Sequence, residues 1–481
     1  MATEYEPVIG LEVHAQLRTR TKIFCGCPAA FGAAPNTHVC PVCLGLPGAL
    51  PVLNAEAVAL AVRVGLALGC ELRPRSVFSR KNYFYPDLPK GYQITQFDLP
   101  ICVGGAVQVP QPDGSSRRVP ITRAHLEEDA GKNLHGASAG SSLVDLNRAG
   151  VPLLEIVGAP EIRSAAEAAE YLRQLRAALM FVGANDGNLE EGSFRCDANV
   201  SVRPRGTDAF GARVEIKNVN SFRFVQRALE WEIAHQIATL SAGGAVEQVT
   251  KTWDEPNDRC VVLRKKEASD DYRYFPEPDL PPLVLTETEV EAARAALPAG
   301  PAERRRRYVA ELGLSAGDAR TLTEHPRLAE YFEDLAARSG DAKRAANWVC
   351  NTVKTAVVTE GLDARFPVTV AQMAGLFARV DDGTLSGKLA KEVYAALEAG
   401  AESADAVIES RGLKVVSDEG AVEAVLREVL GRSEKQVAQY RAGKRAVAGY
   451  FKGEAMKATG GRVDPRVLDA VLARLLDGGS S

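Results

Sequence analysis

The chain has 481 residues, 46% of them hydrophobic and 25% charged, which is enough for about three globular domains. Its net charge of −4 at pH 7 excludes a general affinity for polyanions, so any nucleic-acid contact must come from local basic patches. The acidic N-terminus lacks a signal-peptide pattern and the longest apolar stretch, residues 57–70, is too short to cross a bilayer, which predicts a cytoplasmic protein.

The first candidate site residues lie in the segment "GLEVH" near the N-terminus. Glu12 and His14 are two positions apart, so on a β-strand both side chains point to the same face. A carboxylate beside an imidazole suits metal binding or proton transfer. The alternative is a polar pair at a strand end with no chemical role.

Four cysteines follow within a short stretch. Cys25 and Cys27 are separated by twelve residues from Cys40 and Cys43, with glycine and proline around both pairs. Two short cysteine pairs joined by a loop supply the four sulfur ligands of a closed, structural zinc site. A redox pair or free thiols are the alternatives.

Acidic residues then recur in two motifs. "HLEEDAGK" contains Glu127, Glu128 and Lys132, and "VDLNRAGVPLLEIV" contains Arg148 and Glu155. Glu155 lies inside an apolar run, and a buried carboxylate needs a partner or a metal. The acidic run of the first motif is also compatible with the start of a helix.

Regular elements surround a third polar region. Residues 164–183 predict a helix with Ser164 as its N-cap, and residues 222–240 predict another. Between them, residues 198–203 and 213–217 alternate polar and apolar side chains, which indicates a β-hairpin with one polar face. Arg195 and Lys217 belong to this region. The fold class is therefore α+β, with a mixed or antiparallel sheet.

Nearly everything after Thr286 has a helical pattern, and a second change in composition occurs near residue 405. We expect an α+β domain at 1–290, an all-α helical domain at 291–404 and a small all-α tail domain at 405–481. The four arginines of residues 304–307 spread around a helix, which favours a solvated surface.

The tail holds a local basic excess. Between residues 440 and 463, six basic side chains face one acid, Glu454, with glycines and aromatic residues among them. This pattern suits a phosphate backbone, although a solvated helix face has a similar composition. The candidates for nucleic-acid binding are Lys444, Arg445, Lys452 and Lys457.

Several carboxylates with one imidazole suit magnesium, a hard ion that also bridges nucleotide phosphates. Nearby lysines and arginines would stabilise charge on a transferring phosphoryl group. The chain has no Walker A loop and no dinucleotide-binding glycine motif. A nucleotide would therefore be held by a less common architecture.

Seven motifs together resemble one family along the whole chain, in the family's order: "VIGLEVHAQL", "RKNYFYPDLPKGYQITQ", "HLEEDAGK", "VDLNRAGVPLLEIV", "GSFRCDANVSVRP", "EIKNVNSF" and "DYRYFPEPDLPPL". They are similar to the B subunits of the aspartyl/glutamyl-tRNA amidotransferases, the GatB/GatE family. The resemblance implies a ligase that phosphorylates the side-chain carboxylate of Glu-tRNA(Gln) or Asp-tRNA(Asn) with ATP and then forms the amide. It implies partners too: an amidase (glutaminase) subunit that makes ammonia from glutamine, a small third subunit, and tRNA.

The family's magnesium site falls here on His14, Glu128 and Glu155, with Glu12 and Glu127 as close neighbours. The resemblance also implies that zinc is a structural ion beside the first domain, which is called the cradle in this family. It implies that the tail domain contacts the tRNA. Our own candidates for phosphate contacts are Lys132, Arg148, Arg195 and Lys217.

Two other interpretations compete with this one. The archaeal GatE paralogue usually carries an inserted domain for which 481 residues leave little room. A zinc-stapled tRNA-binding scaffold without chemistry of its own is the second, and the carboxylates in every cradle motif argue against it.

Overall fold

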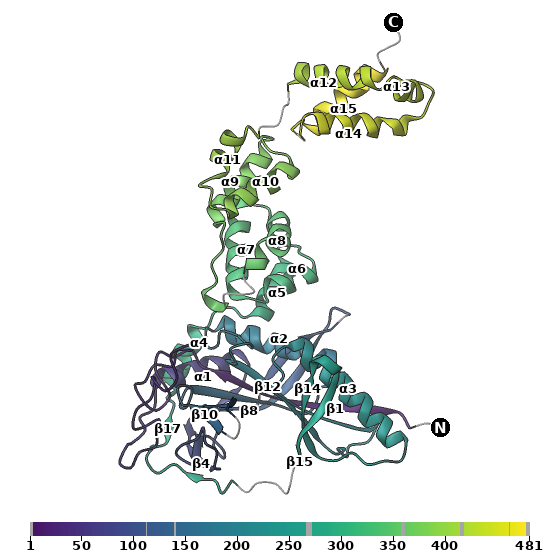
Figure 1. The fold of residues 1–481 in the computed structure, drawn as a ribbon. Coiled ribbons are helices and arrows are strands. Elements are labelled where there is room, and N and C mark those ends of the chain that lie inside the picture. Colours follow the sequence, from purple (N-terminus) through teal and green to yellow (C-terminus); the bar gives the residue numbers. More distant parts are fainter. Residues whose placement is uncertain are drawn as a thin grey trace. The chain divides into compact units, whose positions relative to one another are not determined.

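The computed structural model describes residues 3–111, 113–138, 141–265, 272–356, 361–413, 418–460 and 462–477. The chain divides into two compact units, Met1–Pro326 with Gly361–Asp363, and Arg327–Glu360 with Ala364–Ser481. The first unit combines sheets and helices and the second is helical (Figure 1). This confirms the α+β fold class. The domain boundaries near residues 290 and 404 stay predictions.

The strands of the first unit come before residue 285. They are β1 (Tyr5–Gln16), β2 (Glu71–Leu72), β3 (Arg75–Ser76), β4 (Ser79–Asn82), β5 (Tyr92–Thr95), β6 (Cys102–Val103), β7 (Ala106–Pro110), β8 (Ser116–Glu128), β9 (Lys132–Ser138), β10 (Ser141–Asp145), β11 (Pro152–Gly158), β12 (Phe194–Pro204), β13 (Val214–Lys217), β14 (Val249–Asp254), β15 (Arg259–Lys265), β16 (Phe275–Pro276) and β17 (Leu283–Val284).

The helices of the first unit are partly interleaved with these strands. They are α1 (Ala55–Ala67), α2 (Ala165–Phe181), α3 (Phe222–Ser241), η1 (Glu255–Asn257), α4 (Glu287–Ala295), α5 (Pro301–Ala310), α6 (Ala316–Leu322) and η3 (Gly361–Asp363). The predicted helices at 164–183 and 222–240 are confirmed, and Ser164 and Ser221 cap them by accepting hydrogen bonds from backbone N–H groups.

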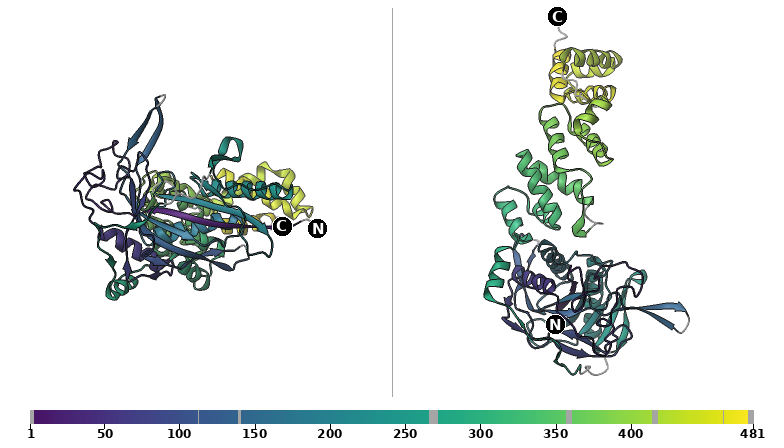
Figure 2. Two further views of the ribbon diagram at one scale, coloured as in Figure 1. Left: turned by 90° about the horizontal axis from the view of Figure 1, so that it is seen from below. Right: turned by 90° about the vertical axis from the view of Figure 1, so that its left-hand side faces the viewer.

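The main sheet runs in the order β15-β14-β13-β12-β1-β11-β8-β5-β4-β16. Its pairs are antiparallel except β13 with β14, which confirms a mixed sheet among the described strands. The predicted hairpin is also confirmed, since Ala198 pairs with Ile216 and Val200 with Val214. A separate two-stranded ribbon, β9–β10, extends from the body of this unit (Figure 2).

Alternation along β1 gives the sheet two different faces. Leu11 and Val13 are buried in one hydrophobic core with Tyr171 and Leu172 of α2. The intervening residues of β1, among them His14, point to the opposite face. One face of the sheet is therefore packed against helices, and the other presents polar side chains.

The second unit contains helices and short 3₁₀ turns among its described residues. They are α7 (Pro326–Ser339, which begins at the last residue of the first unit), α8 (Ala342–Asn351), η2 (Val353–Ala356), α9 (Val370–Asp381), α10 (Gly387–Glu398), α11 (Ala404–Arg411), α12 (Glu419–Arg432), α13 (Glu434–Arg441), η4 (Arg445–Val447), α14 (Ala448–Ala458) and α15 (Pro465–Asp477). Leu426, Phe451 and Leu472 join α12, α14 and α15 in one hydrophobic cluster. No helix in the described parts of the chain is both long and apolar enough to cross a membrane.

Candidate functional site

The register of three central strands brings the first predicted site residues together. His14 on β1 lies opposite Glu155 on β11, and Glu155 lies opposite His125 on β8. Glu127 is two residues beyond His125, so it points to the same face. This acid–imidazole cluster, His14, His125, Glu127 and Glu155, occupies the polar face of the sheet.

The side-chain atoms of the cluster converge. His14 Nε2 lies 3.4 Å from Glu155 Oε2 and 4.0 Å from Glu127 Oε1. His125 Nε2 lies 3.6 Å from Glu155 Oε2 and 3.7 Å from Glu127 Oε2. One ligand atom each from His14, Glu127 and Glu155 lies within 4.8 Å of the others. Two carboxylates and an imidazole aimed at one point fit a divalent cation such as magnesium.

Electrostatics in the cluster favour charged groups. Burial of His14 opposes its charged form, but hydrogen bonding with Glu155 and the negative charges around it raise its pKa overall. Burial of Glu155 acts against ionisation, and His14, His125 and Lys81 outweigh it, so its pKa is lowered. A protonated His14 thus offsets part of the charge of Glu155.

Glu12 occupies the next position along the same face. Its Oε1 accepts a hydrogen bond of 3.0 Å from Asn199 Nδ2, and it lies opposite Asp197 on β12. Burial, followed by the charges of Glu155 and Asp197, raises its pKa. Glu12 therefore extends the acidic face without belonging to the three-residue ligand set.

The structure does not place Glu128 with His14 and Glu155. Successive residues of a strand point to opposite faces, so Glu128 points away from Glu127. Its carboxylate forms an ion pair with Lys90 and accepts a 2.8 Å hydrogen bond from the Ile94 backbone N–H. Glu128 as a magnesium ligand stays a prediction that this geometry does not favour, since the carboxylate near His14 and Glu155 is that of its neighbour, Glu127.

Three of the four candidates for phosphate contacts already have acidic partners. Arg195 donates to Asp129 Oδ2 at 2.8 Å, and Arg148 Nε lies 3.7 Å from the same oxygen. Lys217 Nζ lies 2.5 Å from Asp197 Oδ2. Lys132 has an exposed side chain. The charge of Asp129 raises the pKa of Arg195, which therefore stays protonated.

The sequence analysis did not single out two residues of this face, His125 and Lys81. His125 shares the face of Glu127, and the spacing of two along a strand was a signal for it. The ammonium of Lys81 on β4 lies 4.8 Å from the centre of the Tyr272 ring. Burial lowers the pKa of Lys81, but Glu127 and Glu155 raise it overall. No local pattern marks Lys81, because its partners are distant in sequence.

The four predicted zinc ligands, Cys25, Cys27, Cys40 and Cys43, form a separate four-cysteine cluster. Cys43 Sγ lies 3.4 Å from Cys25 Sγ, 3.6 Å from Cys40 Sγ and 3.7 Å from Cys27 Sγ. Four sulfurs at about 2.3 Å from one zinc ion lie about 3.8 Å apart in a tetrahedron, so the spacing fits this metal. None of these four cysteines forms a disulfide. This four-cysteine cluster can hold a metal such as zinc.

The tail candidates lie on the surface of the second unit. Arg445 pairs with Asp477, Lys452 Nζ lies 2.8 Å from Asp469 and Lys457 Nζ lies 2.8 Å from Glu454. Lys444 is exposed. The acids offset part of the basic excess that the sequence pattern indicated.

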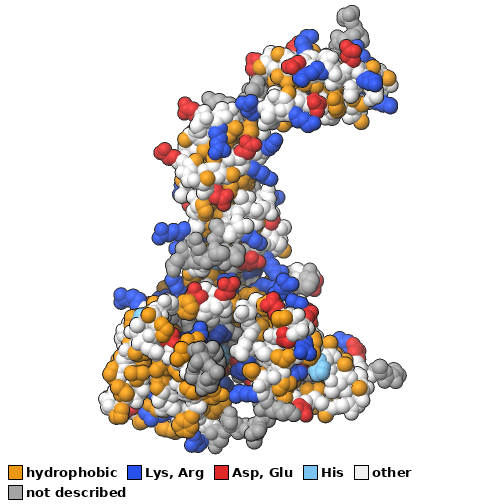
Figure 3. Space-filling view, viewed as in Figure 1, with side chains coloured by type: hydrophobic (Ala, Val, Ile, Leu, Met, Phe, Trp, Pro, Cys, Tyr) orange, Lys and Arg blue, Asp and Glu red, His pale blue; other side chains and the backbone are white. Residues whose placement is uncertain are grey.

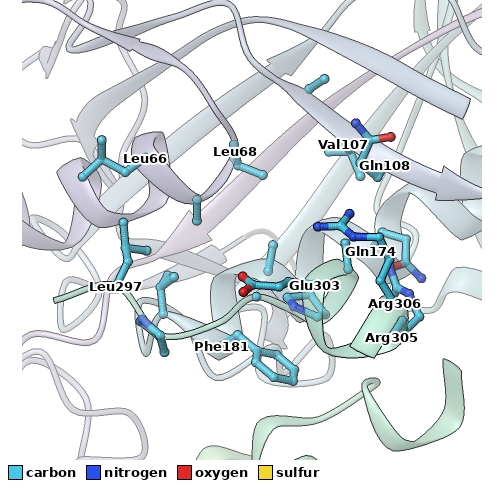
Figure 4. A pocket seen from close by; sticks show the side chains of 18 residues that line it. Leu66, Leu68, Val107, Gln108, Gln174, Phe181, Leu297, Glu303, Arg305 and Arg306 are labelled. Atoms are coloured by element: carbon cyan, nitrogen blue, oxygen red, sulfur yellow. The ribbon is translucent and has the colours of Figure 1, made fainter. Parts of the chain in front are cut away.

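Two other surface features lie in the first unit. A cavity of about 320 Å³ is lined mainly by apolar side chains, with Glu303, Arg305 and Arg306 on one wall, and contains none of the predicted site residues (Figure 4). Hydrophobic side chains also gather on this unit (Figure 3). The large exposed ones near the four-cysteine cluster in the sequence are Phe31, Leu46, Leu50 and Val52.

The first unit carries a candidate catalytic metal site on its sheet and a separate four-cysteine cluster, and a helical unit follows it. This arrangement is that of an enzyme-like domain joined to a helical domain. The chain belongs to the GatB/GatE family. The GatB/GatE catalytic domain matches residues 7–291, and the GatB domain matches residues 330–476.

Curated relatives match along their full length. The chain is 52% identical over 477 residues to the B subunit of aspartyl/glutamyl-tRNA(Asn/Gln) amidotransferase from Halorhodospira halophila, covering 99% of this chain and 100% of the relative. It is 52% identical to the protein of that name from Alkalilimnicola ehrlichii, with 98% and 100% coverage. For Geobacter sulfurreducens the identity is 51%, with 98% and 100% coverage. These names favour the B subunit over its GatE paralogue.

Proposed function

We propose that this chain is the tRNA-binding subunit of a heterotrimeric amidotransferase and carries its phosphorylation and amidation site. The substrates are Glu-tRNA(Gln), Asp-tRNA(Asn) or both. The observation that carries this proposal is the convergence of His14, Glu127 and Glu155 in a chain of the GatB/GatE family.

The reaction needs an activated carboxyl group. A side-chain carboxylate is a poor acyl donor because oxide would have to leave. Its oxygen attacks the γ-phosphorus of ATP, ADP leaves, and an acyl phosphate forms. Ammonia then attacks the carbonyl carbon, phosphate leaves, and loss of a proton from nitrogen gives the amide.

His14, Glu127 and Glu155 are the residues that would hold Mg²⁺, their oxygen and nitrogen atoms lying within 4.8 Å of one another. Bound there, Mg²⁺ would neutralise charge on the β- and γ-phosphate oxygens. Glu12 extends the negative field beside them, and Asn199 holds its carboxylate by a 3.0 Å hydrogen bond.

Arg195 and Lys217 flank this cluster on neighbouring strands, β12 and β13. Both are ion-paired, so a phosphoryl group would compete with Asp129 and Asp197 for them. We propose that they contact phosphate in this way, with Arg148 and Lys132 as further contacts. Such fixed cations stabilise the charge of a transferring phosphoryl group.

Ammonia would come from an amidase (glutaminase) subunit, with a small third subunit completing the heterotrimer. Exposed hydrophobic side chains on the first unit, such as Phe31 and Val52, which are 72% and 73% exposed, support a protein partner there. We propose that the four-cysteine cluster binds zinc as a structural ion.

The test is transfer of label from γ-labelled ATP to Glu-tRNA(Gln) by the three subunits together. Glu127→Gln and Glu128→Gln are a matched pair, since they are neighbours with the same chemistry on opposite faces. We expect Glu127→Gln to lower label transfer and Gln-tRNA formation at least about 100-fold while glutaminase activity persists. Glu128→Gln should lower thermal stability and retain label transfer.

Two results would contradict the proposal. Equal label transfer by wild type and Glu127→Gln would exclude the acid–imidazole cluster as the site of phosphorylation. Absence of tRNA-dependent ATP hydrolysis in the wild-type complex would favour the alternative, in which this chain binds tRNA but has no catalytic activity of its own.

A further inference from the structure

Lys22 has an unusual position for a lysine. Its side chain is fully buried, at 0% exposure, in the first unit. Lysines are almost never fully buried unless their charge has partners. Its ammonium donates to the backbone oxygen of His38 at 2.7 Å, to Cys43 Sγ at 3.5 Å and to the backbone oxygen of Leu146 at 3.3 Å.

The contact with Cys43 has an electrostatic consequence. Zinc binds cysteine as thiolate, so four ligands and one Zn²⁺ carry a net charge of about −2. A buried ammonium beside one sulfur offsets part of that charge in a medium where charges interact strongly. Hydrogen bonds to ligating atoms commonly change metal affinity by about 10–100-fold.

The loop between the two cysteine pairs is bonded to a second segment, residues 144–150. Asn36 Nδ2 donates to the oxygen of Val144 at 2.9 Å, and Asn36 Oδ1 accepts from the Leu146 N–H at 2.8 Å. Asn147 bonds back to the loop through the His38 N–H and the Ala34 oxygen, at 2.8 and 2.7 Å.

Residues 144–150 reach the polar face of the sheet. Arg148 donates to the backbone oxygens of Ala130 and Gly131, at 2.9 and 2.6 Å, and approaches Asp129. The Gly150 N–H donates to the Asp129 backbone oxygen at 2.8 Å. The position of this segment therefore affects the Asp129–Arg148–Arg195 group.

We propose that Lys22 is a positioning residue that joins the four-cysteine cluster to residues 144–150. Its ammonium supports retention of zinc through Cys43, and the zinc-held loop keeps residues 144–150, with Arg148, in place. This inference rests on zinc occupying the four-cysteine cluster and is independent of the amidation chemistry.

The first experiment measures the zinc dissociation constant of the full chain by competition with a chelator. We expect Lys22→Met to raise the constant at least about 10-fold. Lys22→Arg keeps the charge and should recover most of the affinity. The matched control is the double variant Lys251→Met/Glu232→Gln, which removes another buried ammonium with its partner and should leave zinc affinity unchanged.

The second experiment follows hydrogen exchange at the Leu146 and Gly150 amides. In the wild-type chain, zinc removal by chelator should speed exchange at both amides. Asn36→Gly keeps the left-handed backbone, where φ is 60°, and removes the side chain. It should speed exchange at Leu146 and leave zinc affinity unchanged.

Each half of the proposal can fail separately. Wild-type zinc affinity in Lys22→Met would overturn the role of the ammonium. If Lys22→Met does not fold, the test uses Lys22→Arg, which keeps the charge. A loss of zinc affinity in Lys22→Arg as large as in Cys40→Ser, which removes a zinc ligand, would also overturn the role of the ammonium. Unchanged exchange at residues 144–150 after zinc removal from the wild type would overturn the coupling.

Discussion

Individual side chains of the acid–imidazole cluster owe their roles to the face on which they lie. Glu127 and Glu128 are adjacent and chemically identical, yet one approaches His14 and the other pairs with Lys90. The difference arises because a strand turns successive side chains by half a turn. Chemistry assigned by residue type alone cannot separate such a pair.

The raised pKa of His14 predicts a pH effect in the metal-free chain. The pKa of His14 is higher in the folded chain than in the unfolded chain, where it is about 6.5. Protonated His14 therefore stabilises the fold fully at a pH below the unfolded pKa. This stabilisation is lost as the pH rises through the folded pKa. Wild type should therefore lose stability relative to His14→Gln as the pH rises above about 6.5. Urea unfolding at a series of pH values measures it.

Magnesium provides the control for that prediction. The ion binds neutral imidazole, so protons compete with it and Mg²⁺ should stabilise the wild-type chain more at about pH 8 than at about pH 6. His14→Gln should show little of this pH dependence. Parallel stability curves for the two proteins would contradict the assignment of the titrating group to His14.

Packing between secondary-structure elements depends on a few buried polar contacts as well as on the core. Glu232 of α3 is fully buried and accepts from Lys251 of β14 at 2.8 Å. Gln236, one turn further along α3, donates to the other oxygen of Glu232. These contacts fix the position of α3 over the sheet.

Lys251→Met should destabilise the first unit by about 3–5 kcal/mol, because Glu232 is left as an uncompensated buried charge. Adding Glu232→Gln should recover most of the loss. Trp231 fluorescence in urea measures both, since its ring centre lies 5.3 Å from Lys251 Nζ. An equal loss in single and double variants would show that packing, and not charge, holds the helix.

In the molecule as a whole, the candidate metal sites and the basic tail residues lie in different compact units. The acid–imidazole and four-cysteine clusters belong to the first unit, and the tail candidates belong to the second. The hydrophobic cluster of α12, α14 and α15 gives the tail residues a fixed support. Binding of tRNA by the tail is therefore testable by surface changes that leave this cluster intact.

Lys444→Gln/Lys457→Gln should weaken tRNA binding and lower the slope of log affinity against log salt by about 0.7–0.9 for each lost phosphate contact. The control is Glu428→Gln/Arg432→Gln, which removes an exposed ion pair elsewhere in the same unit. Equal salt slopes in all three proteins would mean that the basic stretch is only a solvated surface.

Local patterns in the sequence were sufficient to predict several helices and strands and the residue types of the candidate sites. The N-cap Ser164, the alternation of residues 198–203 and the two cysteine pairs are signals within a few residues, so they are readable without the fold. The same holds for the family resemblance, which rests on short motifs in order. Helices, hairpin and four-cysteine cluster all follow from such signals.

The tertiary structure alone decided which of these groups meet. Strand register brings Glu155 opposite His14 and His125, and places Glu127, not Glu128, beside them. Long-range packing pairs Arg195 with Asp129 and buries Lys22 against Cys43. The physical reason is that register and burial depend on all strands at once, whereas propensity and spacing act only between neighbours in sequence.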